Sequence, residues 1–268
     1  MSDTTNTAAG KTSAEKHPVL VVKDLGIDFG GLTAVNDLNM TVNSDEIYGL
    51  IGPNGAGKTT VFNMLTKVYQ PSRGTITLDG QDMAKLTPVE ANKAGVARTF
   101  QNIRLFSNLT VLDNVKIGMH NSTRYGFFDE ILRLPKFRSE EKRTTEEALK
   151  LLEILGLDKY ADWTAGNLPY GAQRRLEIAR ALATGPKLLL LDEPAAGMNP
   201  QETQELMDMI RTVRDHFHIA ILLIEHDMKL VMGICERITV LNYGMLLAEG
   251  TPAEIQSNKE VIKAYIGE

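Results

Sequence analysis

Residues 52–59 read Gly-Pro-Asn-Gly-Ala-Gly-Lys-Thr, a complete phosphate-binding loop with the pattern G-x-x-x-x-G-K-[ST]. The apolar residues 47–51 before the loop predict a buried strand, and residues 60–66 after it predict a helix. A glycine-rich turn between a strand and a helix N-terminus directs backbone N–H groups at one point, where they favour phosphate. A glycine-rich turn that binds nothing is the alternative. Since every fixed position is filled and both flanks fit, the loop predicts a site for a nucleoside triphosphate.

Two side chains of this loop carry the chemistry that a triphosphate site needs. Lys58 can reach the β- and γ-phosphates, and the hydroxyl of Thr59 can ligate Mg²⁺. The predicted nucleotide-binding residues of this segment are Gly52, Pro53, Asn54, Gly55, Ala56, Gly57, Lys58, Thr59 and Thr60. The loop alone does not say what the energy of hydrolysis is used for.

The composition is that of an ordinary globular protein. The chain has 268 residues, of which 43% are hydrophobic and 24% are charged, enough for one large α/β domain or two small ones. The net charge of −5 gives no electrostatic footprint for nucleic acid or anionic lipid, so we expect no nucleic-acid partner. No apolar run reaches the length of a membrane span.

The first residues argue against a secretory signal, and the cysteine content argues against an internal disulfide. Residues 1–17 are polar and have no apolar core, so they do not resemble a secretory signal and we expect a disordered tail. Cys235 is the one cysteine of the sequence, which excludes an internal disulfide and fits a reducing compartment. Its simplest role is that of a small buried hydrophobe.

The order of predicted elements favours an α/β fold. Strands are expected at residues 19–22, 33–42 and 74–78, and the pattern from 88 to 185 is mostly helical. Strands return at 188–191 and 219–224 with a helix at 202–216 between them, which predicts a parallel sheet with right-handed crossovers. A strand pair at 237–242 and 245–249 turns at Tyr243 and Gly244, and a final helix covers about 252–266.

Two carboxylates end the apolar strand at residues 188–191. In a phosphate-loop fold, the first of them, Asp192, would hold Mg²⁺ beside the γ-phosphate. The second, Glu193, could act as general base on an attacking water. A buried strand whose acids only meet solvent at a turn is the alternative, and the complete phosphate loop earlier in the chain argues against it.

From residue 19 to the C-terminus, the chain resembles the nucleotide-binding subunit of an ATP-binding cassette (ABC) transporter, with its motifs in the same order. The resemblance implies an α/β P-loop fold, with a RecA-like core, an antiparallel β subdomain and an inserted α-helical subdomain. The ATPase domain would cover 18–268, the helical subdomain about 98–185 and the C-terminal helix about 252–266. ATP and Mg²⁺ are the implied cofactors.

The resemblance also implies a role for several single residues. Phe29 matches the aromatic residue that stacks on adenine. Gln101 matches the glutamine that touches Mg²⁺ and senses the γ-phosphate, and His226 matches the histidine that contacts the γ-phosphate. Asp192 and Glu193 match the Mg²⁺-site aspartate and the catalytic glutamate. The implied metal site is therefore Thr59, Gln101 and Asp192, and residues 196–199 take the place of the dimer-contact loop.

The chain departs from the family at its signature, which normally reads Leu-Ser-Gly-Gly-Gln and binds the ATP held by the opposite subunit. Here the segment, called the signature below, consists of Leu168, Pro169, Tyr170, Gly171, Ala172 and Gln173. Pro169 brings neither a hydroxyl nor a backbone N–H, and Tyr170 adds bulk where a close backbone approach is wanted. We therefore expect a weaker composite site here, which favours a heterodimer with a different cassette subunit over a homodimer.

Four further stretches are similar to the larger cassette subunit of bacterial branched-chain amino acid importers. They are the basic and aromatic residues 124–138, and residues 195–200, 224–232 and 250–267. The resemblance implies a subunit at the cytoplasmic face of the cell membrane that couples ATP hydrolysis to solute transport. Its implied partners are transmembrane permease subunits, a second ABC ATPase subunit and, indirectly, a solute-binding protein. Residues 124–138 are a candidate surface for the permease, although core packing is an equal alternative.

Other functions are also compatible with these motifs. Importers of urea or amides and the lipopolysaccharide-export ATPase are close alternatives within the family. A non-transport ABC ATPase usually carries two cassettes or a long coiled-coil insert, and the sequence shows neither. A small-molecule kinase is disfavoured by the Asp192–Glu193 pair with His226 beyond the next strand. A non-hydrolysing regulatory cassette is disfavoured by the same Glu193 and His226.

Overall fold

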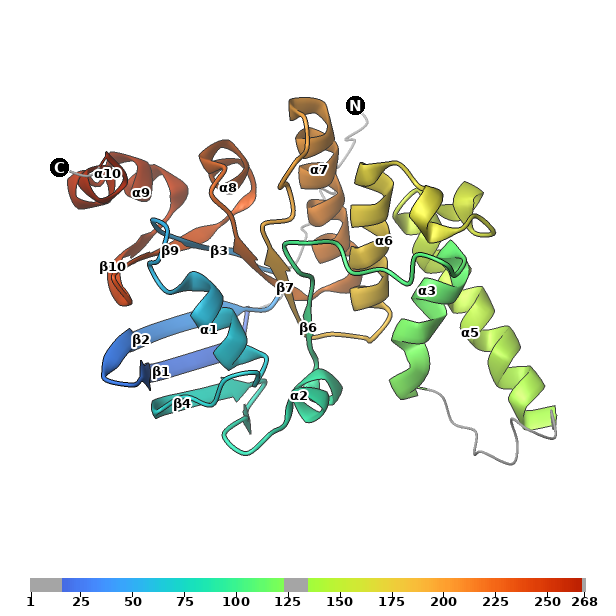
Figure 1. Ribbon diagram of the computed structural model, residues 1–268, viewed down its shortest axis with the longest axis horizontal. Helices are drawn as coiled ribbons and strands as arrows, with labels where there is room; N and C mark the ends of the chain where they lie inside the picture. Colours follow the sequence, from blue (N-terminus) through green and yellow to red (C-terminus); the bar gives the residue numbers. More distant parts are fainter. Residues whose placement is uncertain (1–15, 123–134, 267–268) are drawn as a thin grey trace, which may run out of the picture.

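The computed structural model describes residues 16–122 and 135–266, which form two β-sheets and a group of helices to one side (Figure 1). The smaller sheet is antiparallel, with the strand order β2-β1-β4-β5. Its strands are β1 (Pro18–Phe29), β2 (Leu32–Asn43), β4 (Arg73–Leu78) and β5 (Gln81–Asp82). The expected strands at 19–22, 33–42 and 74–78 are confirmed, and the first of them is longer than the sequence pattern indicated.

The larger sheet is mixed and has the order β10-β9-β3-β8-β7-β6. Its strands are β3 (Ile47–Ile51), β6 (Val96–Arg98), β7 (Leu188–Asp192), β8 (Ala220–Ile224), β9 (Arg237–Asn242) and β10 (Met245–Gly250). Neighbouring strands from β9 to β6 run parallel, whereas β10 returns antiparallel to β9. The turn between them, at Tyr243 and Gly244, has positive φ at both residues (48° and 77°), as a tight hairpin requires.

Nine α-helices are described in these ranges, together with three short 3₁₀ turns. The α-helices are α1 (Lys58–Leu65), α2 (Pro88–Ala94), α3 (Val111–Gly118), α5 (Pro135–Ile154), α6 (Tyr170–Leu182), α7 (Pro200–Phe217), α8 (Met228–Ile234), α9 (Pro252–Ser257) and α10 (Lys259–Ile266). The 3₁₀ turns are Met119–Ser122, Asp158–Tyr160 and Ala165–Asn167. Figure 1 shows α3, α5 and α6 together beyond the edge of the larger sheet, and we call residues 99–122 and 135–185 the helical part.

The central strands are apolar throughout because both faces of the larger sheet are covered. Leu189 and Leu191 of β7 belong to the core cluster that includes α6 and α7. Leu188 and Leu190 belong to a second cluster, which includes α1 and the antiparallel sheet. All four side chains are fully buried. The sequence of β7 is therefore a continuous run of leucines, rather than an alternation of apolar and polar residues, because both faces of its sheet are covered.

Three expectations about the chain are corrected. Residues 96–98 form β6 inside the stretch expected to be mostly helical, since three residues are too few to show a period. The single final helix expected over 252–266 is two helices, because Asn258 is extended and its side chain caps α10 by accepting from the N–H groups of Glu260 and Val261. Of the tail expected at 1–17, residues 1–15 lie outside the described residues. His17 is already part of the fold, since its backbone carbonyl accepts a hydrogen bond from Ser44 N.

Cys235 is buried, with its side chain only 3.1 Å from the position of a Cβ added at Gly49 of β3. Burial raises the pKa of the Cys235 thiol to about 12. Because the thiolate is the nucleophile, we expect no alkylation of the native protein by iodoacetamide at pH 8, and complete alkylation after denaturation in urea. Mass spectrometry checks this directly. Rapid labelling of the folded chain would contradict the burial.

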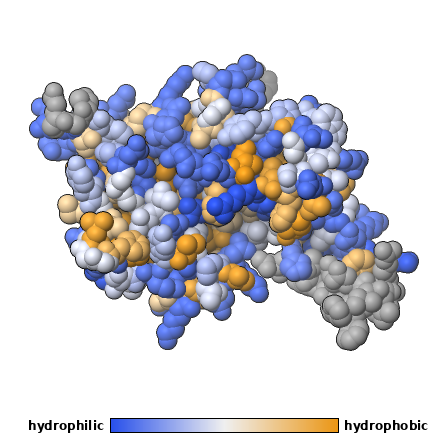
Figure 2. Space-filling view, in the orientation of Figure 1, coloured by the Kyte–Doolittle hydropathy of each residue, from blue (hydrophilic) through white to orange (hydrophobic). Residues whose placement is uncertain are grey.

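Among residues 16–122 and 135–266, no helix combines the length and the apolarity that crossing a bilayer requires. Figure 2 shows a face on which hydrophilic residues predominate and apolar residues form small, separate patches.

Candidate functional site

The phosphate loop, residues 52–59, runs from the end of β3 into the first turn of α1. Gly57 is the N-cap of α1 with φ 101°, a value that side-chain-bearing residues rarely adopt. A Cβ at Gly57 would lie 2.9 Å from Ala34 O, and one at Gly52 would lie 2.2 Å from Leu241 O. These glycines are therefore required by the close approach of neighbouring backbone, and the loop leads into a helix N-terminus, where backbone N–H groups favour phosphate.

Lys58 is held over the loop by two backbone carbonyls. Its Nζ donates to Gly52 O at 2.7 Å and to Pro53 O at 3.0 Å. Burial lowers the pKa of the Lys58 ammonium, whereas the nearby carboxylates of Glu193 and Asp192 raise it. The ammonium thus faces the loop and the two acids at once, which is where the β- and γ-phosphates of a nucleotide would lie.

A pocket of about 440 Å³ surrounds the phosphate loop. It is lined by Asn54, Gly55, Ala56, Gly57, Lys58, Thr59, Thr60 and Glu193, together with Leu32, Thr33, Ala34 and Tyr243. The last four come from the start of β2 and from the β9–β10 turn, which is fixed to the loop by Gly244 N donating to Ala56 O. These four residues were not predicted from the sequence, because only the pairing of distant strands brings them to the loop.

Phe29, which the resemblance assigns to adenine, does not line this pocket. It ends β1 and makes an edge contact with Tyr69, with ring centroids 5.3 Å apart. The side chain is partly exposed, and Leu32 lies nearer to the loop, among the lining residues. The adenine role of Phe29 therefore stays a prediction.

Asp192 ends β7 and is held by an ion pair that the sequence analysis did not foresee. Arg98 Nη2, at the end of the neighbouring strand β6, lies 2.6 Å from Asp192 Oδ2, and both side chains are 8% exposed. Arg98 Nη1 also donates to Asn63 Oδ1 of α1 at 2.7 Å. Arg98 thus fixes the orientation of the carboxylate and leaves its second oxygen for another partner.

Glu193 follows directly and has a positive φ of 46°, which is uncommon for a residue with a side chain. Gln101 Nε2 donates to Glu193 Oε2 at 2.7 Å. His226 Nδ1 lies 3.7 Å from the same oxygen, and its side chain is 67% exposed. Gln101 and His226, two predicted site residues from distant segments, therefore meet at the carboxylate of Glu193.

The residues predicted for Mg²⁺ fit the preferences of that ion. Thr59 offers a hydroxyl, Asp192 its second carboxylate oxygen, and Gln101 its amide oxygen, since its amide nitrogen is bound to Glu193. Mg²⁺ takes oxygen ligands and in such sites keeps waters and substrate phosphates rather than an all-protein cage. Within the described ranges, no three or more His, Cys, Asp or Glu side chains are grouped so that they could hold a metal ion by themselves.

Glu225 is a further site residue that the sequence pattern did not single out. Its side chain is 1% exposed, and burial raises the pKa of its carboxyl, against the lowering effect of three backbone N–H donors. Its oxygens accept from Ala195 N at 2.8 Å and His226 N at 3.1 Å. Glu225 thus ties the loop after β7 to the loop that carries His226. A buried acid at a strand end was the signal available in the sequence.

The signature lies at the first turn of α6, away from the pocket around the phosphate loop. Leu168 and Ala172 are buried in the core, whereas Pro169 and Tyr170 are exposed. Pro169 is the N-cap of α6 and makes no side-chain cap. The hydroxyl of Tyr170 donates to Ala196 O at 2.8 Å, so the signature is joined to the loop after β7 of its own subunit.

The assembled geometry defines a class of protein. The phosphate loop, the paired carboxylates and the histidine follow β3, β7 and β8, which are neighbouring parallel strands, and their side chains converge beside one pocket. A phosphate-binding loop that contains a lysine and lies beside two carboxylates and a histidine is typical of an ATP-hydrolysing enzyme of the P-loop class.

Comparison with known proteins narrows this class. Residues 35–196 match the ABC transporter family, and residues 245–268 match a family described as branched-chain amino acid ATP-binding cassette transporter. An ATP-binding cassette of an ABC transporter, solved in its ADP conformation, superposes with a TM-score of 0.82 at 30% identity, over 94% of this chain and all of that one. The chain belongs to the ABC transporter family and is an ATP-binding, ATP-hydrolysing subunit.

Several curated relatives extend over nearly the whole chain. The high-affinity branched-chain amino acid transport ATP-binding protein LivG of Escherichia coli (strain K12) is 51% identical over 251 residues, which are 94% of this chain and 98% of LivG. BraF of Pseudomonas aeruginosa, named for the same transport, is 48% identical over the same shares. The lipopolysaccharide export protein LptB of Escherichia coli is 35% identical over 93% of this chain and 97% of LptB.

Proposed function

We propose that the chain is an ATPase subunit of an importer for branched-chain amino acids. The observation that carries this is the match of residues 245–268 to the branched-chain amino acid cassette family, supported by the 51% identity to LivG. The matched segment forms β10, α9 and α10, which pack on one another and on β9 and α8, so it is an integral part of this fold. The subunit would act at the membrane surface with permease subunits and a second ATPase subunit.

The proposed reaction is hydrolysis of ATP in the pocket around the phosphate loop. Lys58 and the loop N–H groups bind the triphosphate, and Glu193 orients a water for in-line attack on the γ-phosphorus and accepts its proton. His226, exposed beside Glu193, donates to the γ-phosphate oxygens as charge develops on them. Thr59, Asp192 and Gln101 would hold Mg²⁺, which would supply positive charge to neutralise the phosphate oxygens.

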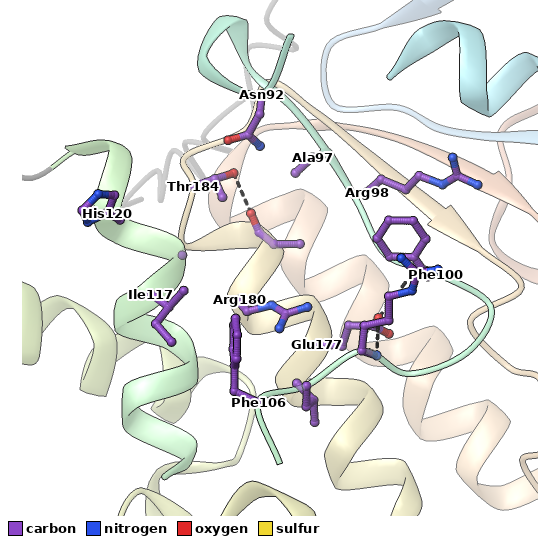
Figure 3. A pocket seen from close by; sticks show the side chains of 14 residues that line it. Asn92, Ala97, Arg98, Phe100, Phe106, Ile117, His120, Glu177, Arg180 and Thr184 are labelled. Carbon is purple, nitrogen blue, oxygen red and sulfur yellow. Dashed lines mark hydrogen bonds between the residues drawn. The ribbon is translucent and has the colours of Figure 1, made fainter. Parts of the chain in front are cut away.

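The helical part is the surface that we propose for the permease. A pocket of about 820 Å³ lies where it meets the edge strand β6, lined by Arg104, Phe106, Arg180 and other residues of both sides (Figure 3). Phe106 is 48% exposed, although its ring is large and apolar. The basic and aromatic insert at 124–138, named as a candidate surface from the sequence, lies outside the described residues up to 134.

Transport by intact cells tests the solute. A strain that lacks the chromosomal gene for this chain should lose high-affinity uptake of radiolabelled leucine, and a plasmid with the wild-type gene should restore it. A plasmid encoding Lys58→Ala should not. Normal leucine uptake in the deletion strain, together with loss of urea uptake or defective lipopolysaccharide export, would replace the proposed solute by one of those alternatives.

The signature provides a test of the proposed heterodimer. Pro169→Ser restores a hydroxyl and a backbone N–H at the N-cap of α6, where a serine also stabilises the helix by about 1 kcal/mol. We expect the turnover of the assembled transporter to rise by about 3–10-fold, which corresponds to about 0.6–1.4 kcal/mol, the net contribution of one typical hydrogen bond. Steady-state ATP hydrolysis measures it, with Pro252→Ser at the start of α9 as control. Equal rates for wild type and Pro169→Ser would argue against a weakened composite site.

A further inference from the structure

Two oppositely charged side chains of α6, Arg174 and Glu177, form an ion pair inside the protein. Arg174 Nη1 lies 2.7 Å from Glu177 Oε2, and the side chains are 0% and 1% exposed. Their spacing of three residues places them on one face of the helix. This face points toward residues 100–104, the segment that follows β6 and contains Gln101.

Both members of this buried pair bind the backbone of residues 100–104. Arg174 donates from Nη1 to Phe100 O and from Nη2 to Gln101 O, each at 2.7 Å. Glu177 Oε1 accepts from Arg104 N at 3.2 Å and from Phe100 N at 3.4 Å. Figure 3 shows Glu177 on α6 beside Phe100. Four backbone groups of one segment are therefore held by two side chains of α6.

Stability alone does not account for this arrangement. Apolar residues of similar volume often stabilise a fold as well as a buried ion pair does, because desolvation of the charges offsets their attraction. In addition, Arg174 Nε is buried and has no hydrogen-bond partner among the residues that the structure describes. An unpaired buried donor costs free energy. What the pair does provide is a fixed position of residues 100–104 relative to α6.

The buried pair thereby connects two functional segments. On one side, the carbonyl bound by Arg174 belongs to Gln101, whose side chain donates to Glu193. On the other side, the signature immediately precedes Arg174 in the first turn of α6. The planar guanidinium of Arg174 binds two successive carbonyls. It therefore transmits a displacement of these carbonyls to α6 more rigidly than a single, rotatable hydrogen bond would.

We propose that Arg174 and Glu177 are positioning residues that couple Gln101 in one ATP site to the signature that meets the ATP of the opposite subunit. A shift of Gln101 on hydrolysis then moves the first turn of α6. The inference rests on the proposed function only in requiring an assembled pair of cassettes; it does not depend on the transported solute.

A double-mutant cycle tests this coupling in the purified transporter. The buried-pair variant combines Arg174→Met with Glu177→Leu. It removes the hydrogen bonds to the backbone of residues 100–104 and keeps a similar side-chain volume. Arg143→Met combined with Glu147→Leu removes an exposed ion pair of α5 and is the matched control. Each background is measured with and without Gln101→Ala. The readouts are kcat and KM for ATP, and binding of a fluorescent ATP analogue to the isolated subunit.

We expect the buried-pair variant to lower kcat about 10-fold, while ATP affinity of the isolated subunit stays within about 2-fold of wild type. Gln101→Ala should then lower kcat by less than about 2-fold further, although it lowers kcat about 10-fold in the control background. The proposal would be overturned if the effects of the buried-pair variant and of Gln101→Ala on kcat multiplied, or if the buried-pair variant left kcat unchanged.

A second variant protects the test against misfolding. Arg174→Lys keeps the buried charge but cannot bind two carbonyls with a planar fork, so the same non-additivity with Gln101→Ala is expected. Full additivity for Arg174→Lys would also overturn the coupling. The purified transporter can also be reconstituted in proteoliposomes, where leucine uptake reports separately on the solute. A failure of the proposed importer function is therefore distinguishable from a failure of the coupling.

Discussion

Replacing Glu193 with glutamine lowers the steady-state rate of ATP hydrolysis by the assembled transporter by about 10²–10⁴-fold, the usual contribution of a positioned general base. Glutamine has nearly the same shape but cannot accept the proton of the attacking water. Binding of ATP should persist, because Lys58 and the phosphate loop are unchanged. ATP should therefore accumulate unhydrolysed between the two cassettes.

Two measurements check this expectation. Release of inorganic phosphate gives the rate, and chromatography of the protein-bound nucleotide shows whether ATP or ADP is retained. Glu153→Gln makes the same chemical change at an exposed position of α5 and serves as control. A Glu193→Gln transporter that turns over within about 10-fold of wild type would remove Glu193 from the role of base.

Truncating Lys58 to alanine should weaken ATP binding by the isolated subunit about 10–150-fold. This range corresponds to about 1.5–3 kcal/mol for a hydrogen bond to a charged group, at tenfold per 1.4 kcal/mol. The loop glycines and the N-terminus of α1 remain, so some affinity for phosphate should survive. Lys58 also bridges two carbonyls of the loop, so part of the loss reflects a less ordered loop.

Titration calorimetry with ATP and Mg²⁺ gives the affinity directly. Lys85→Ala, which removes the same charge at an exposed position, is the control. Circular dichroism establishes that both variants are folded. Unchanged affinity in Lys58→Ala would contradict the assignment of residues 52–59 as the phosphate-binding loop.

The parts of the site that the sequence predicted are those whose geometry is local. The phosphate loop and the Asp192–Glu193 pair each need a strand, a turn and fixed residue types within about ten residues, as such motifs do. Gln101 and His226 were placed only through the resemblance, and the structure brings them to 2.7 Å and 3.7 Å from Glu193.

Other features escaped because their partners are far apart in the sequence. Arg98 and Asp192 are separated by 94 residues, and only the pairing of β6 with β7 makes them neighbours. The sheets and their covering layers could be predicted from the sequence. A strand that is buried on both faces has an uninterrupted run of apolar residues, which is easy to recognise. The break at Asn258 was missed since a single extended residue does not interrupt a helical period enough to be read.

The site is divided between two parts of the molecule. Lys58, Asp192, Glu193 and His226 follow the central strands of the larger sheet, whereas Gln101 and the signature belong to the helical part. The pocket of about 820 Å³ at their junction shares no lining residue with the nucleotide pocket. A compound seated at the junction and ATP would therefore not compete for the same atoms, and such a compound could act on ATP turnover only through the residues that join the two pockets.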